Sequence, residues 1–178
     1  MNIYTPTWFI EGFWQPLQDP SQLILLVSLG LLSGQQGQHV ITKNLALFAG
    51  SLGIGFILNH FYTPIWNVER SLLISALSMS LLVTVQLQLP RVLLFLFNIS
   101  SGIMLGWAST PISIPGFGNS IMYNWSSGVL ISMTLLLAVV SYLSFLLRNL
   151  IHGIALRVIA SWIATSALFV LTLLFIKS

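Results

Sequence analysis

The chain has 178 residues, of which 56% are hydrophobic and only 5% are charged, and it contains no cysteine. About a quarter of the residues of an ordinary soluble domain are charged, because they must cover its surface. The composition therefore predicts an integral membrane protein whose main partner is the lipid bilayer, and it excludes disulfides and thiolate metal sites. The net charge of +3 comes from scattered residues without a basic cluster, so no nucleic-acid partner is expected.

The first 19 residues are expected to lie at the membrane surface. Trp8, Phe9 and Trp14 are of the aromatic type that settles at the boundary between lipid and water. The segment has no basic stretch followed by an apolar core and a cleavage site, so we expect no cleaved signal peptide. Residues 1–19 are therefore predicted to form an N-terminal interfacial segment, and residues 20–176 a single transmembrane domain.

Apolar segments follow one another through the rest of the chain, separated by polar residues, prolines or glycines. Each is predicted to be a helix, because an isolated strand cannot satisfy its backbone groups in lipid. Asp19 is expected to cap the first helix and Pro20 to occupy its first position. The predicted fold is an all-α bundle of about six transmembrane helices, over residues 20–33, 44–59, 71–87, 92–107, 125–147 and 158–176.

The few cations predict the orientation of the chain. Six spans place Lys43, Arg91, Arg148 and Arg157 on one side of the membrane, against two cations on the other. Cytoplasmic loops are enriched in lysine and arginine, so both termini are predicted to lie outside, on the periplasmic side of a bacterial inner membrane.

Small residues at helical spacing predict where the helices approach one another closely. No hydrophobic force drives helices together in lipid, and small side chains allow the backbones to pack. The glycines expected at such contacts are Gly50, Gly53, Gly102, Gly106 and Gly128.

Metal binding and catalysis find little support. His39 is expected in the loop after the first helix, His60 at the outer end of the second and His152 in the last loop, so the three cannot share one ion. The sequence has no HExxH motif, no phosphate loop and no paired carboxylates at helical spacing. We therefore expect no catalytic residues, no metal site and no cofactor, and the protein is not expected to be an enzyme.

Neutral polar residues and one acid are the candidates for a pocket. Asp19 lies among glutamines ahead of a short helix, and polar side chains recur within later helices. Such residues either bond to a neighbouring helix or line a cavity. The candidate polar pocket consists of Gln15, Asp19, Gln22, Ser101 and Asn98. The segment 109–127 is expected to be an outside surface loop or a re-entrant segment.

The stretch QPLQDPSQLILLVSLGLLSGQQG resembles the first transmembrane motif of the HupE/UreJ family of nickel and cobalt permeases, His-Pro-x-x-Gly-x-Asp-His followed by an apolar helix. Pro16 keeps the proline of the motif. Gln15 stands at its first histidine, Ser21 at its aspartate and Gln22 at its second histidine. The amides would keep a polar helix mouth without the charge that holds a metal.

Two further segments resemble the same family. NVERSLLISALSMSLLV has the Val-Glu pair of that family at Val68 and Glu69, ahead of a helix that contains serines. SGIMLGWA resembles its His-Gly-x-x-His-Gly-x-Glu motif and keeps both glycines. In that segment Ser101, Leu105 and Ala108 stand in place of the two histidines and the glutamate. The resemblance implies a permease-like fold from about residue 15 to residue 171 without nickel transport in its familiar form.

Two functions remain open from the sequence. One is transport of a solute other than nickel through the polar pocket. The other is a role as a non-catalytic accessory or structural subunit of a larger membrane complex. Few charges and short loops favour the second, and the resemblance favours the first.

Overall fold

The computed structural model describes residues 5–61, 67–87, 89–109, 119–148 and 153–176, and every regular element in these ranges is a helix. The prediction of an all-α bundle is confirmed. The helices are α1 (Thr5–Gln18), α2 (Pro20–Gln35), α3 (Gln38–Phe61), α4 (Val68–Thr84), α5 (Arg91–Ala108), α6 (Asn119–Arg148) and α7 (Ile154–Ile176).

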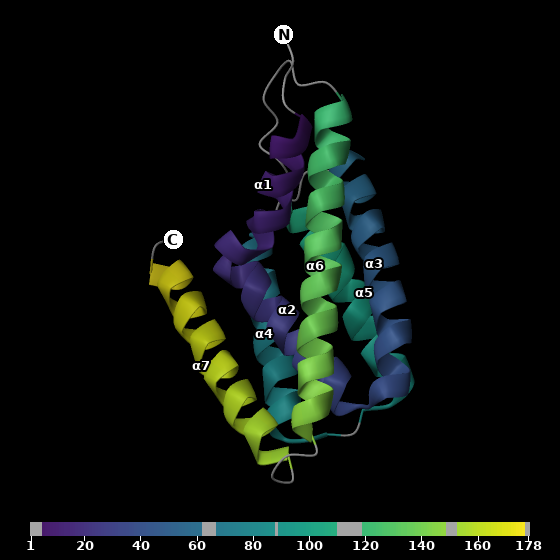
Figure 1. Ribbon diagram of the computed structural model, residues 1–178. Helices are drawn as coiled ribbons and strands as arrows, with labels where there is room; N and C mark the ends of the chain where they lie inside the picture. The colour runs from purple at the N-terminus through teal and green to yellow at the C-terminus, as the bar shows by residue number, and fades with distance from the viewer. Residues whose placement is uncertain (1–4, 62–66, 88, 110–118, 149–152, 177–178) are drawn as a thin grey trace.

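From α2 onward the helices alternate in direction (Figure 1). α2, α4 and α6 run from the end marked N toward the opposite end, and α3, α5 and α7 run back. The starts of α2 and α4 and the end of α5 therefore meet at one end of the bundle, called here the outer end. The turns from α2 to α3 and from α4 to α5 lie at the other, the inner end. Side chains at the starts of α2 and α4 and at the end of α5 therefore lie near one another at the outer end.

The break between α1 and α2 follows from two adjacent residues. Asp19 is the N-cap of α2 and accepts a hydrogen bond from the Ser21 backbone N–H, and Pro20 occupies the first turn, as predicted. Proline lacks the N–H that a continuous helix would need at this point. The chain therefore begins a new helix at residue 20.

α1 packs along the first half of α6 (Figure 1). Its position at a lipid headgroup layer stays a prediction, but its contact is with protein. A Cβ on Gly128 would lie 3.1 Å from the Phe13 nitrogen and would overlap the Phe9 carbonyl. A Cβ on Gly12 would overlap the carbonyl of Trp125 in the same way. The two glycines thus let the backbones of α1 and α6 meet.

α3 and α5 form another close pair, again through glycines. A Cβ on Gly102 would lie 3.0 Å from the Phe48 carbonyl oxygen, and one on Gly106 would lie 3.0 Å from the Gly55 Cα. The expected contacts at Gly50 and Gly53 are wrong, because a Cβ at either position would meet no atom within 4 Å. The helix turns these two glycines away from α5, and Gly55 provides the contact instead.

Four of the described helices are long and apolar enough to cross a membrane: Val40–Asn59, Arg91–Ala108, Met122–Arg148 and Ile154–Ile176. α2 is apolar but shorter, with 16 residues. Leucines that are fully buried, such as Leu25, Leu29 and Leu32 of α2, place this helix in the centre of the bundle. The protein is therefore an integral membrane protein with α2 surrounded by longer helices.

Two sequence-based boundaries need correction. His39 was expected in a loop, but it lies in the first turn of α3, which begins before the apolar run does. The segment 109–127 was expected to be a surface loop or a re-entrant segment, but residues 119–127 form the first turns of α6. In both places polar residues continue a helix beyond the apolar part of its sequence. Residues 110–118 lie outside the described residues.

α4 and α7 run in opposite directions, and an arginine at the start of each bonds to the last turn of the other. The Arg70 guanidinium donates to the Leu174 carbonyl oxygen at 3.3 Å and lies 4.9 Å from the centroid of the Phe175 ring. The Arg157 Nε donates to the Thr84 carbonyl oxygen at 3.0 Å. Cations at helix C-termini satisfy free carbonyl groups and interact favourably with the helix dipole. These contacts attach α7 to α4 at both ends.

Replacing Arg157 by alanine is expected to lower the free energy of unfolding by about 0.5–1 kcal/mol, because the exposed last turn of α4 loses its cationic partner. Thermal denaturation in detergent measures the change. The matched control is Arg91→Ala, which removes another exposed arginine at the start of a helix. Equal stability of the two variants would show that the hydrogen bond from Arg157 to the Thr84 carbonyl contributes nothing to the free energy of unfolding.

Candidate functional site

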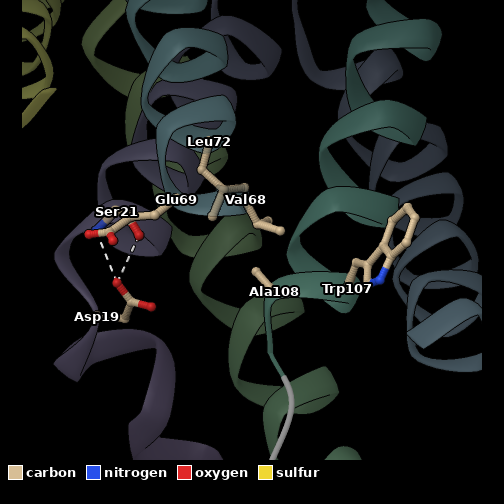
Figure 2. Close-up of a pocket in the computed structure, with 7 residues that line it drawn as sticks. All are labelled: Asp19, Ser21, Val68, Glu69, Leu72, Trp107 and Ala108. Atoms are coloured by element: carbon tan, nitrogen blue, oxygen red, sulfur yellow. Dashed lines mark hydrogen bonds between the residues drawn. The ribbon is translucent and has the colours of Figure 1, made fainter. Parts of the chain in front are cut away.

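A pocket of about 180 Å³ opens at the outer end of the bundle, where α2 and α4 begin and α5 ends. Figure 2 shows Asp19, Ser21 and Glu69 gathered at one side of it, and Ala108 and Trp107 on the helix opposite. Three segments far apart in the sequence thus supply its walls. The pocket is lined by Asp19, Ser21, Val68, Glu69, Leu72, Trp107 and Ala108.

The Asp19 carboxylate is held in place by the helix that it caps. Its Oδ1 accepts hydrogen bonds from the Ser21 backbone N–H at 3.3 Å and from the Ser21 hydroxyl at 2.8 Å. Its Oδ2 accepts a bond from the Gln22 Nε2 at 2.9 Å. A carboxylate has about four lone-pair positions, so three of them are occupied and the group has little freedom to turn. Asp19 is therefore a fixed anion on the pocket wall.

Gln22 connects this wall to the end of α5. Its side chain is 1% exposed, and its Oε1 accepts a hydrogen bond from the Ser109 hydroxyl at 3.2 Å. With Asp19 bonded to its Nε2, the amide of Gln22 is engaged on both sides. The hydrogen-bonded chain Asp19–Gln22–Ser109 therefore connects α2 to the end of α5 directly beside the pocket.

Ser109 is a site residue that the sequence did not reveal. It was assigned to a loop, but its backbone N–H bonds to the Leu105 carbonyl and its side chain is fully buried. A single sequence gives no signal for a bond between residues 22 and 109. The only hint is that a serine directly after an apolar helix can remain within the bundle.

Glu69 brings a second carboxylate to the pocket. It lies in the first turn of α4, where a negative charge interacts favourably with the helix dipole, and its side chain is exposed. Asp19 and Glu69 are two of the three acids in the whole chain. The pocket therefore carries negative charge, which favours cations and hydrogen-bond donors.

The five residues predicted to share a pocket are only partly brought together. Asp19 lines it and Gln22 lies directly behind it. Gln15 lies in the last turns of α1, and its buried Oε1 has no hydrogen-bond partner in the described part of the chain. Asn98 and Ser101 do not line the pocket, because they lie on α5 about 10–15 Å farther along the helix axis than Ala108. The pocket at the outer end therefore does not include them.

No three His, Asp or Glu residues in the described part of the chain are grouped so that they could hold a metal ion. His39 and His60 lie in the first and last turns of α3, about 30 Å apart along its axis. His152 lies outside the described residues. The pocket itself offers two carboxylates and a hydroxyl, a set without the imidazole or thiolate that borderline divalent ions prefer.

The segments that resemble the HupE/UreJ motifs converge on this pocket. Ser21 comes from the first motif, Val68 and Glu69 from the second, and Ala108 from the third, and all four line it. Leu105, at the position of a histidine in the third motif, is fully buried in the apolar core. The positions at which the family's motif has acids thus surround one pocket, but here only Glu69 keeps its charge.

Comparison with families of known proteins gives one finding that covers almost the whole chain. The family model described as HupE / UreJ protein matches residues 3–171. The resemblance drawn from the motifs is therefore confirmed, and the match covers α1 to α6 and most of α7. Comparison with curated proteins and with solved structures finds no match.

Proposed function

Because the chain belongs to the HupE/UreJ family of membrane proteins, we propose that it is a transport protein of the bacterial inner membrane that carries a small polar solute other than nickel. One observation carries this proposal. The motif positions of three segments surround a single pocket at the outer end, yet Ser21 and Ala108 offer a hydroxyl and a methyl group in place of metal ligands. Neither group binds a borderline divalent ion strongly.

The proposed topology has six spans, α2 to α7, with both termini on the periplasmic side. The alternating directions of these helices support it, and so does the position of four cations near the inner end: Lys43, Arg91, Arg148 and Arg157 (Figure 1). In this orientation the pocket faces the periplasm, and α1 stands beside the outer part of α6. Solute would enter from outside. The role requires no catalytic residue, so we propose that the protein is not an enzyme.

Uptake into proteoliposomes tests the proposal. With urea, glycerol and radioactive nickel as probes, we expect flux of at least one neutral solute above that of protein-free vesicles, and none of nickel. Gln22→Leu is expected to lower that flux at least about tenfold, or about 1.4 kcal/mol in the barrier. Leucine has a similar volume but cannot bond to Asp19 or Ser109, and it places an apolar group beside the pocket.

The matched control is Gln18→Leu, which makes the same chemical change at an exposed position of α1 that does not line the pocket. Its flux should equal that of the unmodified protein. Nickel flux, or the absence of flux for every probe, would contradict the proposal. In the second case a role as an accessory subunit gains support, and mass measurement after purification in mild detergent would reveal a stable partner.

A further inference from the structure

A second group of polar side chains lies deep in the inner half of the bundle, away from the outer pocket. Its members come from four helices and are at most 1% exposed. We refer to the group as the inner amide layer, and it consists of Ser33 of α2, Asn44 of α3, Asn98 of α5 and Ser141 of α6.

The packing of α3 on α5 places the two asparagines at the same level. These helices run in the same direction, and Gly102 meets α3 at Phe48 and Ser51. Asn98 lies one turn before Gly102, and Asn44 lies one turn before Phe48. Residues one turn apart share a helix face, so both amides lie on the facing surfaces.

Contacts with α2 bring the serines to this level. The Asn44 Nδ2 donates to the Ser33 hydroxyl oxygen at 3.2 Å. Ser33 is followed by Gly34, where a Cβ would overlap the Ser141 carbonyl and the Ser144 side chain of α6. The Ser144 hydroxyl also donates to the Leu31 carbonyl oxygen of α2 at 3.0 Å. The same turn of α2 therefore contacts both α3 and α6 through polar groups.

Three atoms of this layer have no hydrogen-bond partner among the residues that the structure describes: the Oδ1 of Asn44, the Oδ1 of Asn98 and the hydroxyl oxygen of Ser141. The orientation of the Asn98 amide is fixed, because its Nδ2 donates at 2.8 Å to the Leu94 carbonyl, which can only accept. Its Oδ1 must therefore point elsewhere. Buried polar atoms are normally paired, with protein or with ordered water. The two amide oxygens can only accept a hydrogen bond, whereas the Ser141 hydroxyl can donate and accept, so a molecule that satisfies the amides must be a donor.

Charge limits what that donor can be. None of the four layer residues is ionisable, and the three acids of the chain lie at α1 and at the starts of α2 and α4. A cation placed among neutral groups in a low-dielectric interior pays a large desolvation cost without an opposite charge. Water and small neutral molecules with N–H or O–H groups pay much less.

We propose that the inner amide layer is an internal site for small neutral hydrogen-bond donors, which holds water at rest and passes a neutral solute during transport. The layer lies about 15 Å farther along α5 than Ala108 of the outer pocket. It is thus a second polar position on one route through the bundle. The part that concerns solute passage rests on the proposed function, whereas the binding of water does not.

Water-edited solid-state NMR on the full chain in lipid bilayers, with asparagine and leucine labelled by ¹⁵N, tests the site with water itself as the probe. The side-chain amides of Asn44 and Asn98 are expected to receive magnetisation from water within about twofold of the rate at the exposed Asn67. If magnetisation from water reaches these two side chains no faster than it reaches the backbone amide of the fully buried Leu29, the site is overturned.

A pair of variants connects the site to transport. Asn98→Leu should slow neutral-solute flux at least tenfold and abolish water transfer to Asn44, whereas Asn98→Ser, which keeps a polar group and adds room, should retain both. If Asn98→Leu does not fold, Asn44→Leu tests the same layer from α3. A hydrated layer without any flux would support the water site and reject the proposed function. Flux through a dry layer would reject this inference and leave the proposed function intact.

Discussion

Nickel binding is expected to appear when Ser21 is replaced by aspartate and Gln22 by histidine. These are the positions that correspond to the aspartate and the second histidine of the HupE/UreJ motif. Ser21 already lines the pocket with Asp19 and Glu69, so the substitutions add a carboxylate and an imidazole to two existing carboxylates. Imidazole and carboxylate are suitable ligands for a borderline divalent ion. Affinity for Ni²⁺ should rise at least about 100-fold, or about 2.7 kcal/mol.

Equilibrium dialysis of the purified protein with Ni²⁺ measures this gain. The control replaces Gln18 by histidine together with Ser21 by aspartate, which adds the same groups but puts the imidazole on an exposed part of α1. It should bind nickel weakly. If the Gln22→His variant binds no better than the control, the outer pocket does not occupy the place of the family's metal site.

A methyl group on Gly106 is expected to destabilise the bundle strongly. In Gly106→Ala the new Cβ would lie 3.0 Å from the Cα of Gly55 and would overlap the carbonyl of Leu52. The obstructing atoms belong to the backbone of α3 and cannot rotate away, so α3 and α5 must move apart. Overpacking of this kind costs about 1–3 kcal/mol. Thermal or SDS-induced unfolding in detergent measures the loss.

Gly50→Ala is the matched control within the same pair of helices. A Cβ at that position meets no atom within 4 Å, and alanine is the better helix former. This variant should be unchanged or more stable by up to about 1 kcal/mol. A loss at Gly50 as large as that at Gly106 would show that the close approach of α3 and α5 does not cause the effect, because a Cβ at Gly50 makes no such contact.

The sequence predicts the start of a helix where the residues at that position have a strong conformational preference of their own. Asp19 and Pro20 together specify the start of α2, because one satisfies free backbone N–H groups and the other fits the first turn of a helix. Hydropathy locates the helices because an apolar run in lipid must satisfy its own backbone groups, which a helix does. The predicted start at residue 44 was too late, because Gln38–Lys43 mixes polar residues with Val40 and Ile41 and is already part of α3.

The pocket could be predicted only in part, because its residues are joined by tertiary contacts. Asp19 and Gln22 are neighbours on one helix, so their spacing places them together. Asn98 shares their polarity but lies at another depth, and only the register of α5 against α3 reveals this. Asn44 was taken as the first residue of a helix. Its burial beside Ser33 depends on the turn between α2 and α3.

The length of α2 has a consequence for how Asp19 is hydrated. The 16 residues of this helix extend about 24 Å, whereas the hydrocarbon core of a typical bilayer is about 30 Å thick. Because protein and not lipid surrounds α2, the short helix does not have to reach both surfaces of the bilayer, and it begins well below the outer end of α6 (Figure 1). The Asp19 carboxylate is therefore expected to be hydrated by water that enters between the helices, below the outer end of the bundle.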